Sequence, residues 1–96
     1  MPAYWISHVT VSDEEAYGRY ARLATEAITK HGGRFLARGG RHIQMEGRDR
    51  PRNVVVEFPS LEAAEACYRS PEYQAALEHA REASERELVL VEGAAP

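Results

Sequence analysis

The sequence predicts an α+β domain whose strands and helices follow one another in the order β-α-β-β-α-β. Three kinds of observation lead to this prediction. Runs of β-branched and aromatic residues indicate the strands, apolar residues spaced three and four apart indicate the helices, and glycine or proline marks the junctions. A chain of 96 residues suffices for one hydrophobic core, so we expect a single domain over residues 1–96.

The first part of the chain is predicted to form a strand followed by a long helix. Residues 3–11 are dense in strand-forming types, and Ser12 followed by Glu15 has the spacing of a capping box. Apolar residues then recur at helical spacing over about residues 13–30. Gly32 supplies the left-handed residue that commonly ends a helix.

The middle of the chain is predicted to form a β-hairpin. Residues 34–38 form its first strand, and Gly39-Gly40 forms a bulge or bend. Residues 42–46 are expected to continue the strand briefly. Residues 53–58, with three consecutive valines, form the returning strand.

The second helical segment begins at Ser60 as its N-cap and restarts at Ser70, where Pro71 occupies the first helical position. It is expected to run to about Ser84, and residues 87–92 form the last strand. With right-handed crossovers this order gives the ferredoxin-like sandwich, in which both helices cover one face of an antiparallel sheet. The other face then has no cover, so we expect a homodimer.

Alternation along the predicted strands sorts side chains onto the two faces of the sheet. One set is nearly all apolar and is expected under the helices: Trp5, Val9, Val11, Phe35, Ala37, Val54, Val56 and Phe58. The complementary set is mixed, and it places His8, Arg38 and Glu57 together on the helix-free face. The last strand, with leucines and valines in alternation, is not sorted by this criterion.

Two interpretations of His8, Arg38 and Glu57 remain open. A dimer that buries this face would enclose an imidazole, a guanidinium and a carboxylate among apolar walls, which is the composition of a small-molecule pocket. Alternatively, Arg38 and Glu57 form a cross-strand ion pair that only stabilises the protein.

Composition argues against several classes of function. Lys and Arg number 12 and Asp and Glu number 15, so the net charge of −3 offers no basic surface for nucleic acid. There is no apolar run of the roughly 20 residues needed to span a membrane, and the first residues do not resemble a signal peptide. We therefore expect a cytoplasmic location, with neither membrane nor nucleic acid as partner.

No metal site or bound cofactor is predicted, because the four histidines and the single cysteine do not have ligand spacing. Cys67 lies among alanines at helical spacing and is interpreted as a small buried hydrophobic residue. Tyr20 and Tyr73 belong to an aromatic set in the helices, whose hydroxyl groups could reach a ligand cavity. Arg81 cannot act as a base at neutral pH but is able to bind an anion. The candidate ligand-binding residues are Arg38, Tyr73, Tyr20 and Arg81.

Several segments together resemble a small bacterial family that is classed as a domain of unknown function. They are Tyr17 with Tyr20, Gly32–Gly40, Glu46-Gly47, residues 54–60, Ser70–Tyr73 with Arg81, and residues 88–93. That family belongs to the dimeric α+β barrel superfamily, alongside antibiotic-biosynthesis monooxygenases. The resemblance implies a ferredoxin-like protomer and a dimer whose sheets pack face to face. Cofactor-free oxidation, haem degradation and decarboxylation all occur in the superfamily, but none of them transfers here by motif.

Two hypotheses follow for the function. In the first, the dimer binds a small molecule in a cavity between sheet and helices that is lined by His8, Arg38, Glu57 and Tyr73. A cofactor-free enzyme of the monooxygenase, isomerase or decarboxylase type would then use His8 or Glu57 as its base. In the second, these residues only hold together a structural or regulatory dimerisation module.

Overall fold

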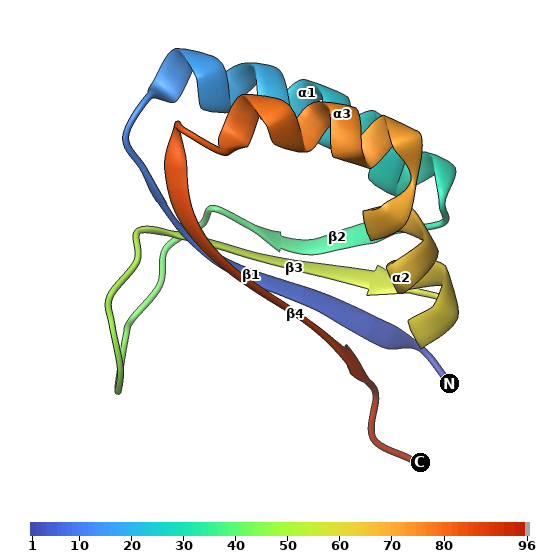
Figure 1. Cartoon of the computed structure of the whole chain (residues 1–96). Coiled ribbons are helices and arrows are strands. Elements are labelled where there is room, and N and C mark those ends of the chain that lie inside the picture. Colours follow the sequence, from blue (N-terminus) through green and yellow to red (C-terminus); the bar gives the residue numbers. More distant parts are fainter. Residues whose placement is uncertain (96) are drawn as a thin grey trace.

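The computed structural model describes residues 1–95 and contains the predicted elements, with the second helical segment divided in two (Figure 1). The elements are β1 (Ala3–Val11), α1 (Glu14–Lys30), β2 (Arg34–Arg38), β3 (Arg52–Phe58), α2 (Leu61–Arg69), α3 (Pro71–Ala80) and β4 (Ser84–Glu92). The strands form one antiparallel sheet in the order β2-β3-β1-β4. The α+β fold class is therefore confirmed.

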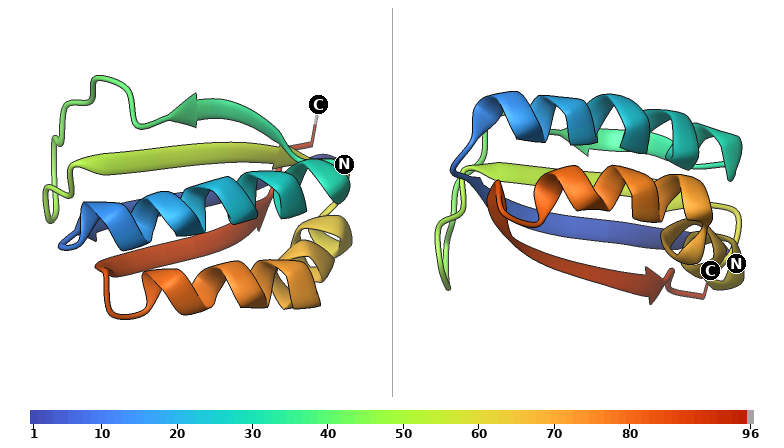
Figure 2. Two further views of the ribbon diagram at one scale, coloured as in Figure 1. Left: turned by 90° about the horizontal axis from the view of Figure 1, so that it is seen from above. Right: turned by 45° about the horizontal axis from the view of Figure 1, so that its top comes forward.

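The helices lie on one face of this sheet. Figure 2 shows α1 and α3 side by side over the sheet, with α2 near one end of it. No helix of the described residues lies on the opposite face (Figure 1). Within residues 1–95, none of the helices has the length and apolar character needed to cross a membrane.

The helix ends follow the sequence with one correction. The N-cap of α1 is Asp13, whose carboxylate accepts a hydrogen bond of 3.1 Å from the Ala16 N–H, and not Ser12 as predicted. Ser12 lies in the bend between β1 and α1, and the N–H groups of Ser12 and Asp13 both donate to the carbonyl oxygen of Ala83, at 2.7 and 3.1 Å. Gly32, with φ of 87°, follows α1 as predicted.

The predicted caps of the second helical segment are confirmed. The Ser60 hydroxyl accepts from the Ala63 N–H at 3.0 Å, and the Ser70 hydroxyl accepts from the Tyr73 N–H at 3.2 Å. Ser70 is in an extended conformation, so α2 ends there and α3 begins at Pro71. The helix stops at Ala80, earlier than predicted, because residues 81–83 form a turn and β4 already begins at Ser84.

Residues 39–51 form an irregular arm between β2 and β3. The predicted strand over residues 42–46 is wrong, because these residues pair with no other strand. Figure 1 shows the arm, in light green, projecting on the side of the sheet away from the helices. Ile43 and Met45 in the arm are 82% and 84% exposed. Arg50 anchors its base through an ion pair of 3.0 Å with Glu87.

The core lies between the sheet and the helices. Trp5 is 1% exposed, and its ring centroid lies 5.8 Å from that of Phe58 and 4.9 Å from that of Tyr73. The predicted facing of β1 and β3 is confirmed, because Trp5, Val9, Val54, Val56 and Phe58 are all buried.

Pairing with β1 also sorts the last strand. Val89 and Val91 are opposite Ile6 and Tyr4, so both valines lie on the helix-free face. Leu90 is opposite Trp5 and lies under the helices. The valines of β4 thus lie on the helix-free face, and Leu90 packs into the core under the helices.

A β-bulge in β2 overturns the predicted position of Arg38. Phe35 is paired with Val56 and Arg38 with Val54, so β2 has one residue more than β3 between these pairs. Because cross-strand partners share a face, the extra residue places Arg38 on the helix-covered side, and Ala37 moves to the opposite side. The grouping of His8, Arg38 and Glu57 on one face is therefore wrong.

Candidate functional site

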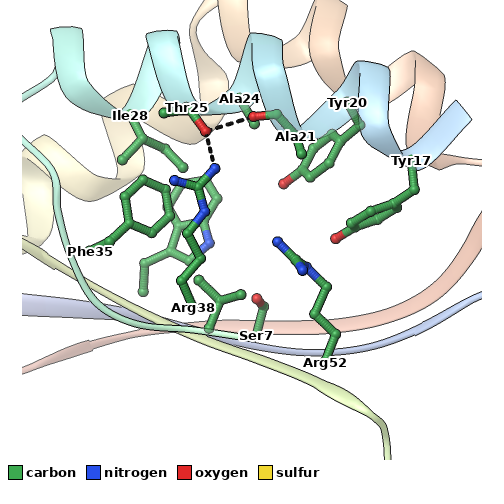
Figure 3. Close-up of a pocket in the computed structure, with 12 residues that line it drawn as sticks. Ser7, Tyr17, Tyr20, Ala21, Ala24, Thr25, Ile28, Phe35, Arg38 and Arg52 are labelled. Carbon is green, nitrogen blue, oxygen red and sulfur yellow. Dashed lines mark hydrogen bonds between the residues drawn. The ribbon is translucent and has the colours of Figure 1, made fainter. Parts of the chain in front are cut away.

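A small cavity lies between α1 and the strands β1, β2 and β3 (Figure 3). Its volume is about 30 Å³, which is room for roughly two water molecules. The lining is mostly apolar and aromatic, and it comprises Trp5, Ser7, Tyr17, Tyr20, Ala21, Ala24, Thr25, Ile28, Phe35, Arg38, Arg52 and Val54.

Tyr20, which lines the cavity, belongs to a hydrogen-bonded group with Tyr73 and Arg86, which lie behind it. The two tyrosine hydroxyl groups lie 2.7 Å apart. Arg86 Nη2 donates to the Tyr20 oxygen at 2.7 Å and to the Tyr73 oxygen at 3.2 Å. The guanidinium carbon of Arg86 also lies 4.7 Å from the centroid of the Tyr20 ring, within range of a cation–π contact.

Burial controls the protonation of this group. It raises the pKa of Tyr20 well above its ordinary value, with a further contribution from Tyr73 that outweighs the opposing attraction of Arg86. Burial likewise raises the pKa of Tyr73. Both hydroxyl groups therefore stay protonated at neutral pH and remain able to donate a hydrogen bond.

Arg38 covers the cavity at the side of β2. Its guanidinium lies 4.2 Å from the centroid of the Phe35 ring and donates a hydrogen bond to Thr25 Oγ1. Thr25 in turn donates to the carbonyl oxygen of Ala21 at 2.7 Å, which leaves its lone pairs free to accept from Arg38 (Figure 3). The Arg38 side chain is otherwise exposed to solvent, so the cover is held by one hydrogen bond and one stacking contact.

Arg52 enters the cavity from β3. Figure 3 shows its guanidinium pointing into the space between Arg38 and the hydroxyl groups of Tyr17 and Tyr20. Its carbon Cζ lies 5.7 Å from the centroid of the Tyr17 ring. The Nε atom of Arg52 is buried and has no hydrogen-bond partner within residues 1–95, and the same is true of Arg86 Nε.

The predicted site residues are divided between separate parts of the molecule. Arg38 and Tyr20 line the cavity, and Tyr73 contacts Tyr20. His8 and Glu57 lie on the helix-free face but far apart. His8 is opposite Asn53 of β3, and Glu57 is four residues further along that strand, which separates Asn53 from Glu57 by about 13 Å. Neither of them lines the cavity.

His8, Glu57 and Arg81 have partners outside the cavity. The His8 ring nitrogen Nδ1 is hydrogen-bonded to Asn53 Oδ1. Glu57 pairs with Arg34 at 2.9 Å rather than with Arg38. Arg81 is exposed at the end of α3 and pairs with Glu78 at 3.3 Å, away from the cavity.

Sequence reasoning missed Arg52, Arg86, Tyr17 and Ser7 as site residues. Ser7 carried a usable signal in the sequence, because it is a polar residue within the apolar alternation of Trp5, Val9 and Val11 in β1. In the structure it is only 3% exposed. Arg86 carried less of one, since its face depends on the pairing of β4 with β1, where it lies opposite Val9.

Cys67 does not contribute to the site. It is fully buried, and burial raises the pKa of its thiol to about 12. A thiol that stays protonated is a poor nucleophile, in agreement with its interpretation as a core residue.

Comparison with known proteins places the chain in a family. A family described as a domain of unknown function, DUF1330, matches residues 2–94. The chain belongs to the DUF1330 family. No curated protein matches this DUF1330 domain by sequence.

Solved structures show the same fold at low sequence identity. A protein of unknown function from Rhodopseudomonas palustris, RPA0582, is 22% identical with a TM-score of 0.78 over 99% of this chain and 84% of its own. A dimeric ferredoxin-like protein of unknown function from Jannaschia is 14% identical with a TM-score of 0.70 over 97% and 100%. SnoaB from Streptomyces nogalater, described as a cofactor-independent oxygenase, is 15% identical with a TM-score of 0.64 over 99% and 95%. The DUF1330 domain therefore has a ferredoxin-like fold, which it shares with these proteins.

Proposed function

We propose that the protein is a homodimer that binds a small molecule in the cavity between α1 and the sheet. One observation carries the binding proposal: Ser7, Tyr20, Arg38 and Arg52 bring polar groups from four different elements to one cavity with apolar walls. A few polar groups that converge in an apolar pocket are typical of a small-molecule site. Stability alone does not require a buried guanidinium nitrogen without a partner.

The dimer proposal rests on the helix-free face. Val89, Val91 and Leu36 are 54%, 44% and 48% exposed, and the first two lie side by side with β1 residues on that face. The arm adds exposed Ile43 and Met45 on the same side (Figure 1). A second copy of the chain would cover these apolar groups, as exposed patches of this kind commonly indicate. The dimeric description of the Jannaschia protein agrees with this proposal.

A cofactor-free oxygenase, isomerase or decarboxylase activity is the second candidate, and the likeness to SnoaB favours it. The cavity lining within residues 1–95 contains no Asp, Glu or His that would serve as a general base. Tyr20 and Tyr73 are protonated donors, and the arginines remain charged. Any chemistry here would therefore rely on holding and polarising a substrate, with His8 and Glu57 taking no part in it.

The fluorescence of Trp5 tests the binding proposal directly. Trp5 is the only tryptophan and lines the cavity, so an occupant should change its emission. We expect saturable changes on titration with small carboxylic acids or their amides, such as benzoate and benzamide. The variant Ala21→Leu fills part of the cavity and should weaken binding at least tenfold, while Ala63→Leu on α2 provides a matched control.

The purely structural alternative gives the opposite result. If no probe changed Trp5 emission or gave heat in calorimetry, the cavity would be only a packing feature. Equal affinities of the wild type and Ala21→Leu would likewise place any binding outside the cavity and contradict the proposal.

A further inference from the structure

The cavity carries positive charge that no acidic side chain in the described part of the chain balances. Arg38 and Arg52 line it, and Arg86 lies behind the Tyr20 ring. None of these arginines takes part in an ion pair within residues 1–95, whereas Arg34 and Arg50 on the other face both do.

The acidic side chain that shares a hollow with Arg52 does not neutralise it. Glu14 shares with Arg52 the lining of a neighbouring hollow of about 190 Å³, but the two side chains form no ion pair. A partly buried cation without a counter-ion is costly, and that cost disappears when an anion occupies the adjacent space. The vacant hydrogen-bonding positions indicate where the anion would lie.

We infer that the small molecule is an organic acid whose carboxylate lies between Arg52 and the Tyr20 hydroxyl group. This inference rests on the proposed function and specifies its ligand. A carboxylate accepts two parallel hydrogen bonds from a guanidinium, and the buried Nε of Arg52 supplies one donor that is not otherwise used. The protonated Tyr20 hydroxyl supplies a further polar contact from α1.

The size of the cavity indicates how the rest of the acid is accommodated. About 30 Å³ is enough for a carboxylate group but not for a larger ligand while Arg38 bonds to Thr25. Arg38 is exposed, so turning it outward breaks one hydrogen bond and opens the cavity beside Phe35. The body of the acid then occupies the space that Arg38 covers, against the aromatic rings of Phe35 and Trp5.

Isothermal titration with benzoate and with benzamide tests this inference, because the two probes have nearly the same shape and differ in charge. We expect benzoate to bind at least tenfold more tightly, and its affinity to fall as sodium chloride is raised. Arg52→Gln should weaken benzoate binding about tenfold or more and change benzamide binding little. Arg22→Gln removes the same charge from an exposed position of α1 outside the cavity, and it should leave both affinities unchanged.

The outcomes separate this inference from the proposed function. Equal affinities for benzoate and benzamide would overturn the organic acid while leaving a small-molecule site in place. If neither probe bound, and neither did the smaller pair acetate and acetamide, the proposed function would fail together with the inference. The comparison of probes on the wild type decides the matter even if Arg52→Gln does not fold, and Arg52→Lys then gives a second test, with intermediate affinity expected.

Discussion

On the helix-free face of the sheet, charged side chains lie beside partners of opposite charge, whereas the arginines on the helix-covered face do not. Glu57 pairs with Arg34 at 2.9 Å, and Arg50 pairs with Glu87 at 3.0 Å. The hydrogen bond to Glu87 is also the main reason why the pKa of Arg50 is raised. Charges on this face are arranged to satisfy one another.

The helix-covered face shows the opposite arrangement. Among residues 1–95, Arg86 donates to the hydroxyl groups of Tyr20 and Tyr73 alone, and Arg38 donates to Thr25. Neutral hydroxyl groups orient a guanidinium but do not cancel its charge. Under the proposed function, the helix-free face serves stability and assembly, and the helix-covered face binds a ligand of complementary charge.

The largest expected effect concerns the helix-free face. In Val89→Asp, a carboxylate replaces an apolar side chain that is 54% exposed in the protomer. If a second copy covers this face, the substitution buries two like charges, and we expect the dimer dissociation constant to rise about 100-fold, or about 2.7 kcal/mol. Size-exclusion chromatography with light scattering at several protein concentrations measures it.

A matched substitution on α1 controls for this result. Leu23 is also an exposed apolar residue, at 39%, but it lies on a helix. Leu23→Asp should leave the dimer intact. A monomeric wild type, or equal dissociation constants for both variants, would remove the assignment of the helix-free face to assembly.

Much of the fold could be predicted from the sequence because local rules and tertiary packing agree there. The apolar alternation of β1 and β3 has one buried face, and Ser60 and Ser70 cap helices as their side-chain chemistry favours. The predicted N-cap of α1, Ser12, was wrong, because Ser12 and Asp13 are both good capping residues and the sequence alone does not choose between them. In the structure the helix begins at Glu14, and the Asp13 carboxylate accepts from the Ala16 N–H.

The candidate site was harder to predict, because it depends on one irregularity in β2. A strict alternation places Arg38 with His8 and Glu57, and the bulge after Phe35 reverses that assignment. No residue in the segment announces the bulge, since the glycine pair that suggested one comes after Arg38. The unpaired state of Arg86 was equally hidden, as it depends on which side chains α1 and α3 bring against β4.

The next prediction concerns the protonated tyrosines of the covered face. Because burial raises the pKa of Tyr20, the native protein keeps this proton in a pH range where the unfolded chain loses it. Above about pH 10 the unfolded state therefore binds fewer protons, and stability falls as pH rises. The slope contributed by one group is at most about 1.4 kcal/mol per pH unit. Urea unfolding at pH 9, 10 and 11 should show a shallower decline for Tyr20→Phe.

The Tyr73→Phe variant gives a second measure of the same effect, in the same direction, because burial raises the pKa of that hydroxyl as well. Parallel declines of the wild type and both variants would show that these hydroxyl groups ionise equally in the native and unfolded states. They would then not be the permanent donors that the site requires.

The smallest expected effect is the change in stability when an arginine on each face is replaced by methionine. Arg34→Met removes the partner of Glu57 and should lower the free energy of unfolding by up to about 1 kcal/mol, as for other exposed ion pairs. Arg52→Met removes a partly buried cation that has no partner, while its side chain still packs against Tyr17, so stability should stay the same or rise by about 1 kcal/mol. Thermal melts at one protein concentration measure both changes. If Arg52→Met were the more damaging variant, its charge would already be satisfied within the protein, and the contrast between the two faces would disappear.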